Sequence, residues 1–113
     1  MAWALDLDGV VWRGDVPIPG AADAVAALRA RGIRVVFLTN NSAPTVADSL
    51  EKLSRFGIPA TGDDLLTSAQ AAARLLEPGQ TGLVCAGPGV TEALAERGVK
   101  AVREGHADVD AVV

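Results

Sequence analysis

Short apolar runs alternate along the chain with stretches in which apolar residues recur every three or four positions. The runs are rich in Val, Leu and Ile and are bounded by glycines, prolines or short polar residues, a pattern typical of β-strands. The first run, 2–5, is expected to form a strand buried in a sheet. The complete set of expected strands is 2–5, 33–38, 65–67, 83–86, 99–102 and 110–113.

Helical periodicity fills the segments between these runs. The first helix follows Pro19-Gly20 and is expected to end before Gly32, and the second is expected to begin at its N-cap Thr45 and to stop at Gly57. Threonine is favoured at the residue before a helix, and glycine is favoured just after its last residue.

Two further helices are expected in the second half of the chain, at 69–76 and 90–97. Ser68 is the expected N-cap of the third helix, and the Pro-Gly pair within 77–79 should end it. This break is the best internal boundary. The segment 87–89, Gly-Pro-Gly, reads as a tight turn before the fourth helix; it looks slightly like a phosphate loop, but a lone Gly-x-Gly is a weak signal.

The alternation of strands and helices predicts an α/β fold. Its first strand, helix and strand form one βαβ unit, whose crossover is right-handed and whose strands are parallel. Asp6 and Asp8 follow the first strand, and Thr39, Asn40 and Asn41 follow the second. Both polar clusters are therefore expected at the carboxyl ends of neighbouring strands, where open α/β sheets bind ligands.

Other interpretations of these residues deserve comparison. An Asp-x-Asp-Gly sequence can begin a calcium loop, but an EF-hand needs polar and acidic groups where this chain has Val10 and Pro17. Residues 39–42 alone would be read as a turn, and only their spacing from Asp6 and Asp8 favours a functional role. Trp12 is expected to pack under the turn.

Beyond the turn, Arg13 is a weaker candidate for facing a substrate. His106 is expected to be a surface residue of the polar stretch 103–108. The two lysines, Lys52 and Lys100, do not follow a strand end, and Lys52 is expected on the outer part of the second helix.

Three segments together resemble the amino-terminal half of the haloacid dehalogenase-like phosphatases, in the branch (subfamily IIA) with a large cap inserted after the second motif. They are 6–15 (DLDGVVWRGD), 18–21 (IPGA) and 38–42 (LTNNS). The resemblance implies a Rossmann-like parallel sheet, with residues 1–79 in an incomplete catalytic core and 80–113 at the start of the cap.

In that family a lysine and a further acidic metal-binding motif follow the cap, and these 113 residues stop before any place where they could occur. The chain is therefore expected to be a fragment that is inactive and poorly soluble by itself.

The resemblance implies a phosphatase of small phosphomonoesters that works through an aspartyl-phosphate. Asp6 would be the nucleophile, and Asp8 the general acid and base. Thr39, Asn40 and Asn41 would hold the phosphoryl oxygens. Two carboxylates beside a phosphate imply Mg²⁺, bound by the side chain of Asp6 and the main-chain oxygen of Asp8. The alternative is a non-catalytic α/β binding or interaction module.

The composition of the chain restricts the kinds of molecule that it is expected to bind and the cell compartment in which it is expected to work. The 14 acidic and 10 basic residues give a net charge of −4, which argues against nucleic-acid binding. No segment has the basic and apolar pattern of a signal peptide or the length of a membrane span. The lone Cys85 is expected to be a buried small hydrophobe, and it favours a reducing cytoplasm. A small phosphorylated metabolite is the expected partner, and the cap of the full-length protein is a candidate surface for homo-oligomerisation.

Overall fold

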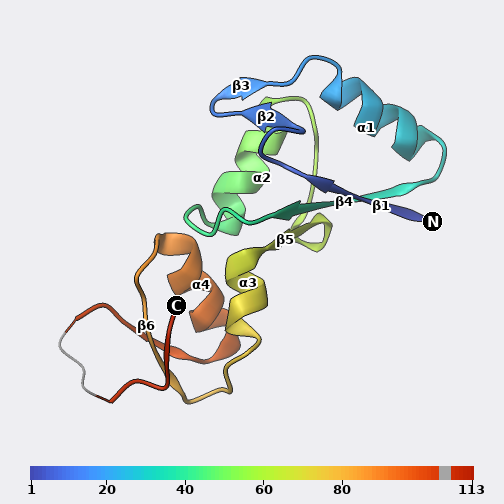
Figure 1. Ribbon diagram of the computed structural model, residues 1–113. Helices are drawn as coiled ribbons and strands as arrows, with labels where there is room; N and C mark the ends of the chain where they lie inside the picture. The colour runs from blue at the N-terminus through green and yellow to red at the C-terminus, as the bar shows by residue number, and fades with distance from the viewer. Residues whose placement is uncertain (105–107) are drawn as a thin grey trace. The chain divides into compact units, whose positions relative to one another are not determined.

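The structure, a computed structural model, describes residues 1–104 and 108–113, so His106 lies outside the described residues. The chain divides into two compact units (Figure 1). The first unit comprises Met1–Thr39 and Val46–Leu66, and the second comprises Asn40–Thr45 and Thr67–Val113. No helix in the described ranges is long and apolar enough to cross a membrane.

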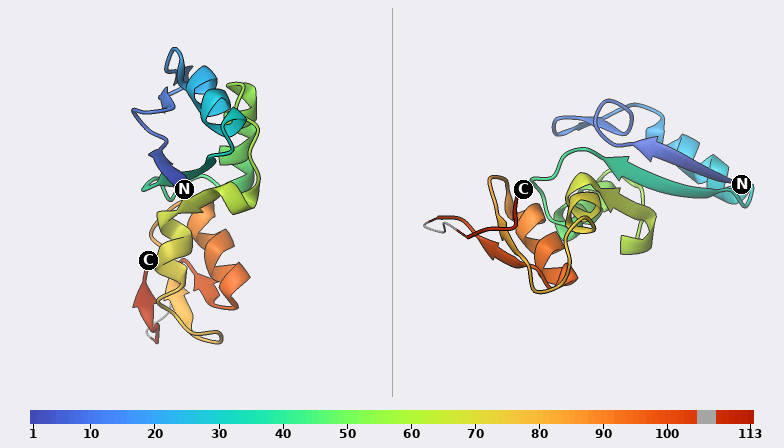
Figure 2. Two further views of the ribbon diagram at one scale, coloured as in Figure 1. Left: turned by 90° about the vertical axis from the view of Figure 1, so that its right-hand side faces the viewer. Right: turned by 60° about the horizontal axis from the view of Figure 1, so that its bottom comes forward.

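The first unit contains a parallel pair of strands, as the sequence predicts. Strand β1 (Ala2–Asp6) pairs in parallel with β4 (Arg34–Thr39), and Asp6 lies opposite Leu38. Figure 2 shows the two strands side by side and pointing in the same direction. Strand β5 (Leu65–Thr67) completes the sheet in the order β1-β4-β5. The two polar clusters therefore emerge at one end of neighbouring strands.

Two helices and a small hairpin complete this unit. Helix α1 (Ala21–Ala30) precedes Gly32, and α2 (Val46–Arg55) precedes Gly57. Both glycines have positive φ angles, 73° and 82°, which explains why each helix ends there. The unit also contains a hairpin of β2 (Trp12–Arg13) and β3 (Val16–Pro17) and a short helix η1 (Gly62–Asp64), which the sequence pattern does not predict.

One hydrophobic core joins these elements. Its fully buried side chains come from the turn after β1, from β4, from α2 and from the segment after α2. The largest of them are Leu7, Val11, Phe37, Leu53 and Ile58.

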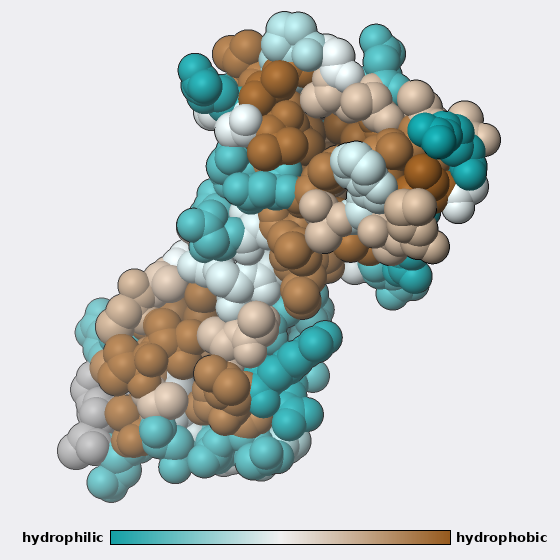
Figure 3. All heavy atoms as spheres, turned by 45° about the vertical axis from the view of Figure 1, so that its right-hand side comes forward, coloured by the Kyte–Doolittle hydropathy of each residue, from teal (hydrophilic) through white to brown (hydrophobic). Residues whose placement is uncertain are grey.

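The prediction that 2–5 forms a buried strand is wrong about burial. Residues Ala2–Ala4 are exposed, and Trp3 keeps 47% of its surface accessible. Strand β1 is the edge of its sheet and pairs on one side only. Figure 3 shows apolar residues over much of the visible face of the first unit, the upper body in that view. An apolar run specifies a strand, whereas its burial depends on which layers stack against it.

The second unit is another small α/β assembly. Strand β6 (Thr81–Leu83) lies between β7 (Lys100–Val102) and β8 (Ala111–Val112), and both pairings are parallel. Helices α3 (Ser68–Ala73) and α4 (Pro88–Arg97) pack against each other beside this sheet. Leu94 and the buried alanines of both helices lie in its core.

Helix α3 differs from its prediction at both ends. Thr67, not Ser68, is the N-cap: its hydroxyl accepts from Gln70 N, and the Gln70 side chain accepts from Thr67 N. The Ser68 hydroxyl instead donates to Asn40 O. The helix ends at Ala73, three residues before the predicted end.

Two other expectations for the second unit are also wrong. Cys85 is exposed, and it lies beyond the end of β6 at Leu83. The segment 87–89 is not a separate turn: Gly87 is the N-cap of α4, and Pro88 and Gly89 are its first two residues. Proline is favoured there because the first N–H groups of a helix have no intrahelical acceptor.

The two compact units meet in sequence after Leu66, ahead of the boundary expected after Gly79. Compact units are defined by contacts within one chain, whereas a core and its cap are defined by family architecture. The assignment of 1–79 to a catalytic core and of 80–113 to a cap stays a prediction.

Candidate active site

The first unit places three of the predicted site residues close together. Asp6 is the last residue of β1, and Thr39 is the last residue of the adjacent β4. Asp8 follows two residues after Asp6, and its Oδ2 lies 3.5 Å from Thr39 Oγ1. Parallel pairing of β1 and β4 therefore brings Thr39, the first residue of the second polar cluster, beside Asp8, as the βαβ spacing predicts.

A tight turn of the backbone presents the two carboxylates. The buried Leu7 carbonyl accepts from the N–H groups of Val10, Val11 and Trp12, at 3.3, 2.9 and 3.2 Å. Gly9 has a φ of 85°, a conformation that side chains other than glycine's rarely adopt. The chain thus coils around Leu7 and leaves Asp6 and Asp8 exposed.

The two carboxylates have different surroundings. Asp6 Oδ1 accepts from Leu7 N at 2.8 Å, and within the described part of the chain its Oδ2 accepts no hydrogen bond. Asp8 has both side-chain oxygens in contact with donors: Trp12 Nε1 at 3.0 Å on Oδ1, and Thr39 Oγ1 on Oδ2. Asp6 therefore offers an oxygen for new bonds, while Asp8 is held in one orientation.

Asn40 and Asn41 belong to the second unit, although they follow Thr39 directly. The Asn40 main-chain oxygen accepts from Ser68 Oγ at 2.9 Å, and Asn41 Oδ1 accepts from Ala43 N at 3.2 Å. Thr39 itself is buried, with 7% of its surface accessible. The structure thus brings Asp6, Asp8 and Thr39 together, and it assigns the two asparagines to the loop that follows.

Two neighbours of the site were misjudged or missed in the sequence. Trp12 is buried as expected, but its hydrogen bond to Asp8 was not foreseen, although a spacing of four residues across a glycine turn is compatible with it. Lys52 does not extend from an outer helix face: its Nζ donates to Gly14 O at 2.7 Å and pairs with Asp15 at 3.5 Å.

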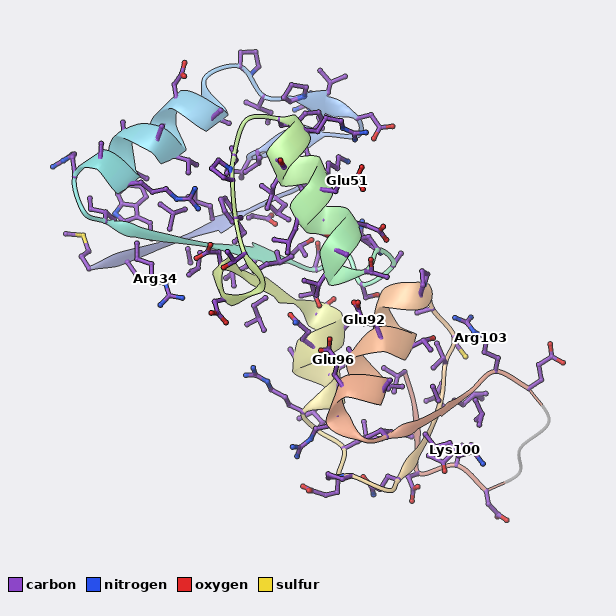
Figure 4. The ribbon with its side chains drawn as sticks, turned by 180° about the vertical axis from the view of Figure 1, so that it is seen from behind. Arg34, Glu51, Glu92, Glu96, Lys100 and Arg103 are labelled. Carbon is purple, nitrogen blue, oxygen red and sulfur yellow. The ribbon has the colours of Figure 1, made fainter. Side chains whose placement is uncertain are left out.

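Lys52, the lysine of the first unit, is engaged by partners other than Asp6 and Asp8. Lys52 Nζ is engaged by the loop between β2 and β3, and it lies 4.6 Å from the centre of the Trp12 ring. Lys100, labelled in Figure 4, lies on β7 of the second unit. Arg13, the other candidate near the turn, is exposed on β2.

The oxygens available to a metal ion are few. No cluster of three or more metal-binding side chains occurs among residues 1–104 and 108–113. Asp6 Oδ2 accepts no described hydrogen bond, and the main-chain oxygen of Asp8 accepts none from the turn that surrounds it. Carboxylate and carbonyl oxygens are ligands that Mg²⁺ accepts. These two groups therefore fit part of the coordination sphere of a hard cation.

The curated relatives of this chain include phosphatases. The chain is 35% identical over 113 residues to D-glycerol 3-phosphate phosphatase of Mycobacterium tuberculosis, covering 96% of this chain and 31% of the relative. It is 35% identical over 101 residues to acid sugar phosphatase of Staphylococcus saprophyticus, covering 87% of this chain and 39% of the relative. The chain thus spans less than half the length of these curated relatives.

Solved structures agree on the fold. A crystal structure of glycerol phosphate phosphatase from Mycobacterium tuberculosis, in complex with magnesium, superposes with a TM-score of 0.87 at 34% identity, over 98% of this chain and 34% of that one. The p-nitrophenyl phosphatase from Archaeoglobus fulgidus gives a TM-score of 0.82 at 29% identity, over 89% of this chain and 40% of that one.

The profile of one sequence family covers most of the chain. It matches residues 3–100, a range that includes both polar clusters and extends into both compact units. Together with the adjacent strand ends that carry Asp6, Asp8 and Thr39, this match shows that the chain belongs to the haloacid dehalogenase-like hydrolases.

Proposed function

We propose that the protein containing this chain is a Mg²⁺-dependent phosphatase that hydrolyses a small phosphomonoester through an aspartyl-phosphate. The observation that carries the proposal is the meeting of Asp6, Asp8 and Thr39 at the carboxyl ends of β1 and β4. Phosphoryl transfer needs an oxygen nucleophile, a proton donor for the leaving oxygen and stabilisation of the equatorial oxygens. A candidate residue for each of these three roles lies at the carboxyl ends of β1 and β4.

Asp6 is the nucleophile in this proposal. Its Oδ1 is held by Leu7 N, which leaves Oδ2 as the oxygen that attacks phosphorus. As the new bond forms, the bond from phosphorus to the ester oxygen breaks, and its electron pair stays on the leaving oxygen. The product of this half-reaction is a phosphorylated Asp6 and an alcohol.

Asp8 is the general acid and base. It gives its proton to the leaving oxygen in the first half-reaction and, as a carboxylate, takes a proton from water in the second. The water oxygen then attacks phosphorus and releases Asp6 with inorganic phosphate. Thr39, Asn40 and Asn41 are proposed to donate hydrogen bonds to the phosphoryl oxygens.

The residues present fit a magnesium ion. The Asp6 carboxylate and the Asp8 main-chain oxygen would hold it, because a carboxylate has two oxygens and can bind a cation while one of them serves as the nucleophile. When bound, Mg²⁺ would offset the charge repulsion between the carboxylates and the phosphate. The related glycerol phosphate phosphatase structure is in complex with magnesium, which supports the choice of Mg²⁺ as the ion.

The names of the relatives support the substrate class. Glycerol phosphate and sugar phosphates are both small phosphomonoesters, and we propose a substrate of this class. The net charge of −4 supports a metabolite rather than a nucleic acid as partner, and the single cysteine supports a cytoplasmic location. Homo-oligomerisation through the cap stays a proposal.

The test is Asp6→Asn in the full-length protein, assayed with p-nitrophenyl phosphate and Mg²⁺. We expect turnover to fall by roughly three orders of magnitude or more, because an amide is a poor nucleophile, with the folded state retained by circular dichroism. Glu51→Gln is the matched control, since Glu51 lies exposed on α2 (Figure 4) and its loss should leave activity unchanged. Near-normal turnover of Asp6→Asn would contradict the role of Asp6.

A second outcome would favour the alternative function. A non-catalytic module would bind phosphorylated ligands without turnover, so a wild-type protein that hydrolyses no phosphomonoester in the presence of Mg²⁺ would support it. The presence of Asp6 in an intact turn argues for the enzyme.

A further inference from the structure

The Asp8 carboxylate is held by a side chain that the phosphatase chemistry does not itself require. Trp12 Nε1 donates to Asp8 Oδ1 at 3.0 Å. Resting on the function proposed above, we propose that Trp12 is a positioning residue whose indole N–H confines the transferable proton of Asp8 to Oδ2.

The direction of the hydrogen bond carries this inference. An indole N–H can only donate, so Asp8 Oδ1 must be an acceptor whether the carboxyl group is protonated or not. The proton that Asp8 delivers and recovers is then restricted to Oδ2. The neighbour of Oδ2 is Thr39 Oγ1 at 3.5 Å, and a hydroxyl can either donate or accept. Both protonation states of Asp8 are therefore compatible with the same arrangement.

The indole is fixed in place by its surroundings. Trp12 has 4% of its surface accessible, and its ring meets the Phe56 ring edge-on, with centres 6.0 Å apart and planes at 64°. A buried indole N–H requires an acceptor, and Asp8 is the acceptor that the turn provides. The packing therefore determines the direction from which Asp8 is held.

Lys52 supports the indole from α2. Its ammonium lies 4.6 Å from the centre of the Trp12 ring and is tied to Gly14 O and Asp15 in the loop between β2 and β3. A cation over the ring face attracts the π electrons and makes the N–H a better donor. Helix α2, the hairpin and the turn after β1 are thus joined at Trp12, in one compact unit.

A purely structural interpretation would reverse the roles, with Asp8 serving only to satisfy a buried indole. The two interpretations predict different kinetics. If Trp12 directs the proton of Asp8, replacing Trp12 should lower kcat most for substrates whose leaving group needs protonation. If it only supports the fold, its loss should affect all substrates alike.

The experiment replaces the N–H without removing the ring, in the full-length phosphatase. In Trp12→Phe we expect kcat on glycerol phosphate to fall roughly tenfold and kcat on p-nitrophenyl phosphate to fall less than about threefold, with KM unchanged. Substitution of Trp12 by 3-benzothienylalanine, which has sulfur in place of N–H, should give the same pattern while preserving the packing. Trp3→Phe, at an exposed position, is the control that should leave both rates unchanged.

Each outcome decides between the interpretations. Equal losses on the two substrates, or wild-type rates for the benzothienyl variant, would overturn the role of Trp12 and leave the phosphatase function intact. A wild-type protein that hydrolyses neither substrate would instead overturn the function itself.

Discussion

At the scale of single residues, Asp6 and Asp8 differ in their hydrogen bonds although they are two positions apart. Asp6 keeps one oxygen without a described donor, whereas both oxygens of Asp8 contact donors from Trp12 and Thr39. A nucleophile needs an oxygen that is available, and a general acid needs a defined orientation. The local contacts therefore match the two roles that we propose.

Replacing Asp8 provides a test at this scale. In the full-length protein, Asp8→Asn should lower kcat on an alkyl phosphate by about 10²–10⁴-fold, because the alkoxide leaves without a proton. The loss on p-nitrophenyl phosphate should be smaller, since p-nitrophenolate is a good leaving group. Steady-state kinetics on both substrates would check this, and equal losses would show that Asp8 serves the metal or the structure instead.

At the scale of secondary-structure elements, the loop after β4 is held by the beginnings of two helices in the second unit. Ser68 at the start of α3 donates to Asn40 O, and Gly89 N in the first turn of α4 donates to Ala43 O at 3.0 Å. The loop that carries Asn40 and Asn41 thus has a defined backbone path within its own unit.

Gly89 allows the first turn of α4 to lie close to the backbone of the loop after β4. A Cβ at position 89 would collide with Pro44 O and would lie 2.6 Å from Ser42 O, so Gly89→Ala must displace the loop or the helix. We expect a loss of unfolding free energy of roughly 1–3 kcal/mol or more. Thermal or urea unfolding of the full-length protein would measure it.

Gly62→Ala is the matched control for this prediction. A Cβ at position 62 would meet nothing within 4 Å, and the residue is exposed. Its effect should stay within about 0.5 kcal/mol. A Gly89→Ala protein as stable as this control would show that the contact with the loop is not required.

At the scale of the whole molecule, the two units each form a small parallel sheet with its own core. In the first unit one edge of β1 is unpaired. Trp3 and Leu38 are exposed in this unit, with 47% and 41% of their surface accessible. An exposed edge strand with apolar side chains favours pairing with another chain.

A polypeptide of these 113 residues alone should therefore self-associate and show no phosphatase turnover. The described site contains Asp6, Asp8 and Thr39, but Lys52 is engaged by the hairpin loop and Lys100 lies on β7. Analytical ultracentrifugation and an assay with p-nitrophenyl phosphate and Mg²⁺ would check both expectations. A soluble monomer with metal-dependent turnover would contradict this prediction.

The sequence by itself determined the order of the longer helices and strands and the candidate chemistry. The periodicity of 33–38 and 65–67 predicts β4 and β5, and the polar residues after two strands predict adjacent strand ends, which the parallel pairing of β1 with β4 confirms. These signals are local, or depend on the short connection of one βαβ unit, so they can be read along the chain.

Only the tertiary structure decided burial and the contacts between distant side chains. The exposure of β1, the hydrogen bond of Trp12 to Asp8 and the position of Lys52 over the Trp12 ring all depend on how separate elements pack. Sequence spacing does not specify such contacts, because one periodic pattern is compatible with several ways of stacking its layers. The close approach that requires Gly89 likewise appears only once α4 lies against the loop after β4.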